Sequence, residues 1–305
     1  MKILITGGAG YKGVLLVKAL LDLGHDVILT DNFMYGYSSV LHLINHPRLV
    51  IQSLDVRNIT RENLAVADII FHLAGISSMP ACAANPHSAE VINLHASKRL
   101  VSLLGKGQIL VYASTTSIYG SAALECDEKI PVDPPSLYAK TKYEAEKIVM
   151  THPNAISLRF ATVFGVSPRM RADILVNDFT YKAVNERSIV LFGSRSKRTF
   201  MHLDDAVSAY LFALKNANLM RGGIYNVGDE SLNFSKLDIA TAIRKHIKFE
   251  IIDSSLPDLD ARDFMISFKK IRELGYRTER TLDDGIKELL KLYSFFKVHS
   301  HFSVI

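Results

Sequence analysis

The sequence predicts an α/β fold built on a parallel sheet, and two observations indicate this class. Short runs of apolar residues alternate with segments of helical period through the first half of the chain. A glycine-rich turn also joins the first apolar run directly to the first helical segment. Apolar runs of this kind are typical of parallel strands buried on both faces, and their alternation with helices is typical of a doubly wound, Rossmann-type sheet.

The individual elements of this half follow from the same patterns. Strands are expected at Lys2–Thr6, Asp26–Asp31, Arg48–Ser53, Ile69–Leu73, Gln108–Ser114 and Ile156–Phe160. Helices are expected at Gly13–Leu23, Glu90–Leu104 and Tyr138–Met150.

The rhythm changes after Gly165, where the elements become shorter and mixed. A helix-like run at Leu203–Lys215 and a strand-like run at Gly223–Gly228 could rejoin the main sheet. We therefore expect a Rossmann domain over residues 1–165 and a smaller C-terminal α/β substrate lobe over residues 166–305. Residues 200–229 of the second part are expected to return to the first domain.

Composition excludes several classes of protein. The chain has 305 residues, of which 48% are hydrophobic and 22% charged, so a sizeable core is feasible. Cys82 and Cys126 are too few for a disulfide framework or a cysteine-based zinc site, and no histidine–acid cluster suggests a metal. A net charge of +5 is weak evidence for nucleic acid. Because no apolar stretch has membrane-span length and no signal peptide is readable, we expect a soluble, cytoplasmic protein.

The glycine-rich turn has the chemistry of a phosphate-binding loop. Gly7, Gly10 and Gly13 follow the first strand with the spacing G-x-x-G-x-x-G and open the first helix. Glycine leaves room for a pyrophosphate, and the free N–H groups of the helix favour its charge. Asp31 ends the second strand; its carboxylate can accept ribose hydroxyls and would repel a 2′-phosphate, which favours NAD over NADP. Other candidate cofactor contacts in these loops are Tyr11, Lys12 and Asn32.

A second motif, Tyr138-Ala-Lys-Thr-Lys142, places a phenol and an ammonium one turn apart on a helix. A neighbouring cation stabilises phenolate and lowers the pKa of tyrosine, so that Tyr138 could take and return a proton near neutral pH. Alone, this spacing is common, and it usually marks a solvated lysine beside a surface tyrosine.

The combination of the two motifs resembles the extended short-chain dehydrogenase/reductase family, and more narrowly its nucleotide-sugar epimerase and dehydratase branch. Segments along nearly the whole chain are similar to family motifs, including His72-Leu-Ala-Gly75 and Ser114-Thr-Thr-Ser-Ile-Tyr-Gly120. The resemblance implies NAD as cofactor, and it implies Tyr138, Lys142 and Thr115 as the catalytic residues. It also implies cofactor contacts at Asp55, Val56, Leu73, Ala74, Gly75, Asn93 and Ser114.

The same resemblance implies a nucleoside-diphosphate sugar as substrate. Arg198 and Arg262 match two family arginines that meet the diphosphate, and a guanidinium offers the planar fork of donors that suits it. Surface ion pairs are the simpler interpretation of either arginine alone. Further substrate contacts are expected at Ser78, Thr115, Thr116, Tyr138, Thr162 and Asn177, although Asn177 could equally cap a helix. Family members often form homodimers, so we expect one here.

The residues after Thr115 narrow the reaction that the resemblance implies. The family's 4,6-dehydratases carry an Asp-Glu pair there, whereas this chain has Thr116 and Ser117. Decarboxylases usually have glutamate at the position of Ser117, which weakens that alternative as well. We therefore expect a C4 epimerase acting through a 4-keto sugar. The alternatives are a reductase of an NDP-4-keto sugar and, as a different class, a non-catalytic dinucleotide sensor or RNA-associated protein.

Two positions depart from the family pattern. Lys12 lies where the family usually has Ile or Phe, and Thr162 replaces an asparagine that contacts pyrophosphate. The basic segment Ser167–Arg171 follows closely and could compensate.

Overall fold

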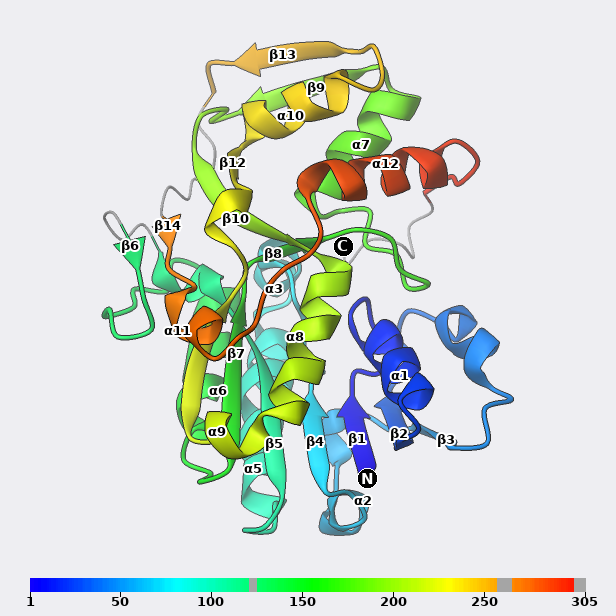
Figure 1. Ribbon diagram of the computed structural model, residues 1–305, viewed down its shortest axis with the longest axis vertical. Helices are drawn as coiled ribbons and strands as arrows, with labels where there is room; N and C mark the ends of the chain where they lie inside the picture. The colour runs from blue at the N-terminus through cyan, green and yellow to red at the C-terminus, as the bar shows by residue number, and fades with distance from the viewer. Residues whose placement is uncertain (121–124, 257–264, 299–305) are drawn as a thin grey trace.

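The computed structural model describes residues 1–120, 125–256 and 265–298, and it confirms the α/β fold with a Rossmann-type parallel sheet. Within these ranges seven parallel strands form the main sheet in the order β11-β7-β5-β4-β1-β2-β3 (Figure 1). The strands are β1 (Lys2–Thr6), β2 (Asp26–Asp31), β3 (Leu49–Ser53), β4 (Ile69–His72), β5 (Ile109–Thr115), β7 (Ala155–Phe160) and β11 (Gly223–Val227). Order reverses between β1 and β4, which is the point where doubly wound sheets bind ligands.

Helices cover both faces of this sheet. They are α1 (Gly13–Asp22), α2 (Arg61–Ala65), α3 (Met79–Ala84), α4 (Pro86–Ala89), α5 (Ala96–Leu103), α6 (Leu137–Val149), α8 (Leu203–Lys215), α9 (Ala217–Met220) and α11 (Lys269–Glu273). Successive side chains of a strand point to opposite faces. Ile3 and Ile5 of β1 therefore join the core beneath α1 and α8, while Leu4 joins the core beneath α2, α5 and α6. The central strands β1, β4, β5 and β7 are buried on both faces, which explains their continuous apolar runs, whereas the edge strand β3 is partly exposed.

One expected helix differs from the prediction. Residues 86–103 form α4, a π-helical turn at Glu90–His95 and α5, instead of one regular helix at Glu90–Leu104. Asn93 lies within the π turn and is buried; its side chain accepts a hydrogen bond from the N–H of Ile76, on the loop after β4, and donates one to the Ile76 carbonyl. A π turn rotates the side chains within a helix, and it is often found beside functional sites.

The C-terminal lobe has its own core and its own small sheets. Among the described residues, β8 (Thr162–Phe164), β10 (Lys197–His202) and β12 (Asn233–Ser235) form one sheet, and β9 (Ser188–Phe192) pairs with β13 (Glu250–Ser254). The lobe's helices are α7 (Leu175–Asn185), α10 (Lys236–Arg244) and α12 (Leu282–Tyr293). A short pair, β6 (Glu125–Cys126) and β14 (Met265–Ile266), lies beside them.

The chain leaves the main sheet after β7 and later returns to it. From β10 in the lobe, α8 runs back along the sheet and packs near α1, and β11 then pairs with β7 as the edge strand (Figure 1). In the described part of the chain, no helix is both long and apolar enough to cross a lipid bilayer.

Candidate active site

A cavity of about 670 Å³ lies at the carboxyl ends of the central strands, between the main sheet and the C-terminal lobe. Residues predicted to bind the cofactor and residues predicted to bind the substrate both contribute to its wall. The predicted cofactor residues on the wall are Gly7, Gly10, Tyr11, Lys12, Gly13, Asp31, Asn32, Asp55, Val56, Leu73, Ala74, Gly75, Ser114, Tyr138 and Lys142. The predicted substrate residues on it are Ser78, Thr115, Tyr138, Thr162 and Arg198. Arg262 lies outside the described residues.

The glycine loop forms a tight cradle at the floor of the cavity. Gly7 has a φ of 72°, donates its N–H to the Thr30 carbonyl at 2.8 Å, and would bring a Cβ to 2.7 Å from the Ala74 nitrogen. A Cβ on Gly13 would collide with the Gly7 carbonyl oxygen. Helix α1 begins here without a side-chain cap and without an acidic residue in its first turn. The Val14 N–H donates to the Gly10 carbonyl, and the other N–H groups at this end of the helix are available to an anion, so the loop fits the diphosphate of a dinucleotide.

Asp31 is fixed at the end of β2 by backbone donors. One carboxylate oxygen accepts a hydrogen bond from the Ala9 N–H at 3.0 Å and the other from the Phe33 N–H at 2.9 Å. Burial raises the pKa of Asp31 above its ordinary value, and these two donors oppose that rise. Each carboxylate oxygen can accept more than one hydrogen bond, so the group keeps capacity for ribose hydroxyls.

A second carboxylate lies nearby on the loop after β3. Asp55 forms an ion pair with Arg57 at 2.8 Å and accepts a hydrogen bond from the Asn32 side chain at 3.1 Å. These contacts, chiefly the one with Arg57, lower the pKa of Asp55 to about 2. Asp55 therefore stays ionised and can act only as an acceptor near neutral pH.

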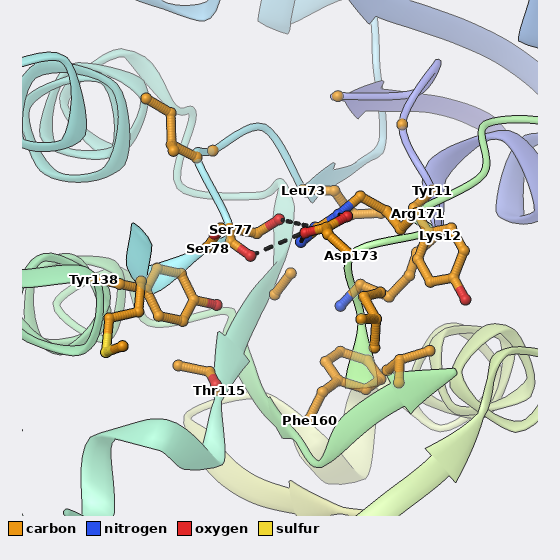
Figure 2. Close-up of a pocket in the computed structure, with 18 of the residues that line it drawn as sticks. Tyr11, Lys12, Leu73, Ser77, Ser78, Thr115, Tyr138, Phe160, Arg171 and Asp173 are labelled. Carbon is orange, nitrogen blue, oxygen red and sulfur yellow. Dashed lines mark hydrogen bonds and ion pairs between the residues drawn. The ribbon is translucent and has the colours of Figure 1, made fainter. Parts of the chain in front are cut away.

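Tyr138 and Lys142 lie on the first turns of α6, which begins after the capping side chain of Ser136. Figure 2 shows the Tyr138 ring and the Thr115 side chain on the same side of the cavity. The Lys142 ammonium lies 4.0 Å from the centre of the Tyr112 ring. Burial lowers the pKa of Lys142 to about 7, and the nearby Lys12 ammonium lowers it further in the same direction. The wall thus combines a phenol, a hydroxyl and an ammonium poised to titrate near neutrality.

Three predicted residues lie behind the cavity wall, where they support it. Thr116 is buried and donates to the Phe160 carbonyl at 3.2 Å. Asn93 accepts a hydrogen bond from the Ile76 N–H at 2.8 Å. Asn177 accepts from the Gly165 N–H at 3.1 Å and donates to the Tyr11 hydroxyl at 3.2 Å. None of the three is on the wall within the described residues, because these contacts turn each side chain toward other groups of the protein.

The structure also brings residues to the cavity that the sequence patterns did not assign. Arg171 forms an ion pair with Asp173 at 2.6 Å and donates to the Ser77 hydroxyl at 3.0 Å. Arg169 stacks over the Tyr35 ring at 4.2 Å. The basic segment Ser167–Arg171 was visible in the sequence, but its contacts with the first domain depend on folding. Cations on the wall outnumber acids, which suits an anionic ligand; they are Lys12, Lys142, Arg169, Arg171, Lys182, Arg198 and Lys236.

Comparison with known proteins places this arrangement in a family. The sequence model of a family described as "NAD dependent epimerase/dehydratase family" matches residues 3–228 of this chain. A Bacillus subtilis (strain 168) protein named as an uncharacterized UDP-glucose epimerase, YtcB, is 31% identical over 249 residues, covering 75% of this chain and 77% of that protein. UDP-glucuronic acid decarboxylase 1 of Danio rerio is 28% identical over 313 residues, covering 96% of this chain and 72% of that protein.

Solved structures share the fold. The crystal structure of UDP-glucuronic acid 4-epimerase from Bacillus cereus, in complex with UDP-glucuronic acid and NAD, superimposes with a TM-score of 0.85. It is 22% identical in sequence, and the match covers 96% of this chain and 99% of that one. The expected cofactor, NAD, is confirmed by the family, and the glycine cradle fits it. The chain therefore belongs to the NAD-dependent epimerase/dehydratase family.

Proposed function

We propose that this protein is an NAD-dependent epimerase that inverts C4 of the sugar in a nucleoside-diphosphate sugar. The observation that carries the proposal is that Tyr138, Lys142 and Thr115 line the same cavity as the glycine loop. A phenol that exchanges a proton, an ammonium that stabilises phenolate and a hydroxyl that orients the reacting oxygen are sufficient for reversible oxidation of a sugar alcohol.

Each of the three side chains has a distinct role in this proposal. Tyr138 removes the proton of the sugar 4-hydroxyl and returns it after the keto sugar has turned over. Lys142, one helical turn away, favours the phenolate form of Tyr138. Thr115 holds the reacting oxygen by a hydrogen bond. The acceptor and donor of hydride is supplied by NAD when it is bound.

The residues after β5 favour epimerisation over dehydration. Elimination of water from the sugar needs a further acid or base beside the reacting carbon. Positions 116 and 117 carry Thr116 and Ser117, and the Thr116 hydroxyl is already engaged with the Phe160 carbonyl. Neither position offers a carboxyl group, whereas epimerisation at C4 requires none.

Ser78, Thr162 and Arg198 are the proposed contacts of the sugar nucleotide, because they line the part of the cavity formed by the loop after β4 and by the C-terminal lobe. Uridine is the base we propose, since the two relatives reported above are named for UDP-glucose and UDP-glucuronic acid. We also propose a homodimer through α5 and α6, which pack side by side on one face of the sheet. Light scattering after size-exclusion chromatography tests the dimer.

The test of the reaction is NMR of purified protein incubated with UDP-, dTDP-, CDP- and GDP-sugars without added cofactor. We expect an equilibrium mixture of two C4 epimers from one donor, and loss of the second epimer in Tyr138→Phe. Tyr143→Phe is the matched control, because Tyr143 lies on the same helix and does not line the cavity. No new isomer from any donor would contradict the proposal; consumption of NADH with an NDP-4-keto sugar would then establish the reductase instead.

A further inference from the structure

Lys12 is a cation inside the cavity that the proposed reaction does not use. Its side chain leaves the glycine loop and extends toward Phe160, as Figure 2 shows, with its ammonium 3.9 Å from the centre of the Phe160 ring. The ammonium also lies 5.7 Å from the centre of the Tyr210 ring. Aromatic faces attract a cation, but they do not neutralise its charge.

Within the described residues, no carboxylate pairs with this ammonium. Asp173, an acid on the wall, accepts hydrogen bonds from the Nε and Nη2 atoms of Arg171 at 2.7 and 2.6 Å. Asp31 is bound by backbone N–H groups of the adjacent loops. Burial, together with the charge of Arg171, lowers the pKa of Lys12 to about 7. A partly buried amine with cations as neighbours either loses its proton or is stabilised as ammonium by an anion, and a ligand that enters the cavity can supply that anion.

The position of the ammonium indicates which part of a ligand would meet it. Phe160 is the last residue of β7 and lies opposite Thr115 of β5 in the parallel register. The Lys12 ammonium therefore lies at the reacting end of the cavity, and the backbone N–H groups of its own loop face the diphosphate end. In a complex with the proposed substrate, the sugar ring would occupy the reacting end, so an anion there would be carried by the sugar.

We propose that Lys12 selects a sugar nucleotide whose sugar carries a carboxylate, a hexuronic acid, over its neutral hexose counterpart. This inference rests on the proposed function in one respect, namely that the cavity holds a nucleoside-diphosphate sugar. A carboxylate would form a charge-assisted hydrogen bond with the ammonium and would relieve its repulsion from Arg171 and Lys142. Lys12 is thus a specificity residue, and Tyr138 keeps the proton transfer.

Binding rather than turnover tests the inference. Calorimetry of the NAD-loaded protein compares UDP-glucuronate with UDP-glucose, which differ only at C6, for the natural protein, Lys12→Met and Lys12→Arg. We expect the natural protein to bind the uronate at least about tenfold more tightly, a difference of about 1.4 kcal/mol. Lys12→Met should remove this preference by weakening uronate binding alone, and Lys12→Arg should keep it. Lys18→Met, on the exposed face of helix α1, which begins directly after Lys12, is the matched control and should leave both affinities unchanged.

Several results would overturn the inference. These are equal affinity of the natural protein for the two ligands, equal loss of both in Lys12→Met, or loss of NAD with both sugars unaffected, which would assign the ammonium to the cofactor diphosphate. If Lys12→Met does not fold, Lys12→Gln replaces it, and the preference of the natural protein must also shrink between 50 and 500 mM salt because it rests on charge. A preference for uronate without formation of any epimer would support Lys12 as a specificity residue and refute the epimerase.

Discussion

The Tyr11 hydroxyl donates a hydrogen bond of 2.7 Å to the carbonyl of Gly165, although the two residues are 154 positions apart in the chain. Asn177 donates to the same hydroxyl at 3.2 Å, and the Ser167 hydroxyl donates to the Tyr11 carbonyl at 2.8 Å. The cofactor loop of the first domain is therefore fastened to the segment that leads into the C-terminal lobe. Any ligand between them is held by both parts of the protein.

Tyr11→Phe tests this connection. The substitution removes the hydroxyl, so that the Gly165 carbonyl keeps only the longer hydrogen bond from Asn177, at 3.4 Å. We expect a loss of about 1 kcal/mol in the free energy of unfolding, the usual size for a buried hydrogen bond, and faster loss of NAD on dialysis. Urea unfolding and absorbance at 260 nm measure the two effects. Tyr37→Phe, on an exposed ring, should show neither.

A buried ion pair beneath the site supports a second prediction. Glu146 of α6 and Arg159 of β7 form a contact of 2.6 Å, and both are almost completely buried. Glu146→Ala leaves the Arg159 charge without its partner, so we expect about 3–5 kcal/mol of destabilisation in chemical unfolding. Glu144→Ala, two residues away in an exposed pair with Lys147, should cost less than about 1 kcal/mol. Equal losses in the free energy of unfolding would show that the buried pair contributes no more to stability than the exposed one.

A third prediction concerns the shape of the glycine loop. In Gly13→Ala the new methyl group would collide with the Gly7 carbonyl oxygen, so the loop must open and its N–H groups must move. We expect about 1–3 kcal/mol of overpacking strain and loss of NAD from the purified protein. Gly107→Ala meets nothing within 4 Å and should leave both the melting temperature and NAD content unchanged.

The two lysines in the cavity make the ligand-free protein sensitive to pH. Lys12 and Lys142 each have a pKa of about 7 in the folded protein, well below the ordinary value of 10.5. Between these values the unfolded chain binds more protons than the folded one, so these groups make stability rise with pH from 7 toward 10. Below pH 7 both states hold the protons, and the cost of burying the charges is constant.

Lys12→Met isolates part of this dependence, because other titrating groups are common to both proteins. We expect the variant to be more stable than the natural protein by about 1 kcal/mol near pH 6, a typical size for a point substitution. The difference should shrink as pH rises toward 10. Urea unfolding of NAD-free protein at pH 6, 7.5 and 9 measures it; a difference that grows with pH would contradict the assigned direction.

Local pattern was enough to predict the first half of the fold. The strand at Asp26–Asp31 was predicted at its observed bounds, because an apolar run flanked by turns depends only on neighbouring residues. The helix at Glu90–Leu104 was predicted as continuous, and the structure instead has a π turn at Glu90–His95. Asn93 bonds to a loop from another part of the chain there, and such a contact leaves no trace in the periodicity.

In the candidate site, too, the local motifs could be predicted from the sequence and the long-range contacts could not. The glycines of the loop and the Tyr138–Lys142 spacing are local motifs, so the sequence could propose them. Lys12 was predicted as a cofactor contact and noted as a departure from the family pattern, but its contact with the ring of Phe160, 148 residues later in the sequence, could not be predicted. The pairing of Arg171 with Asp173 and Ser77 likewise needs the two parts of the chain to meet.

The return of β11 to the main sheet has a consequence for synthesis on the ribosome. Asn226 of this edge strand accepts a hydrogen bond from the Tyr119 hydroxyl at 2.7 Å, and that hydroxyl also accepts one from Arg159. When the ribosome has released the chain only as far as residue 165, β7 is an unpaired edge strand. The polar cluster of Tyr119 and Arg159 then still lacks Asn226. The first half must wait for more than sixty further residues to be translated before its sheet can close.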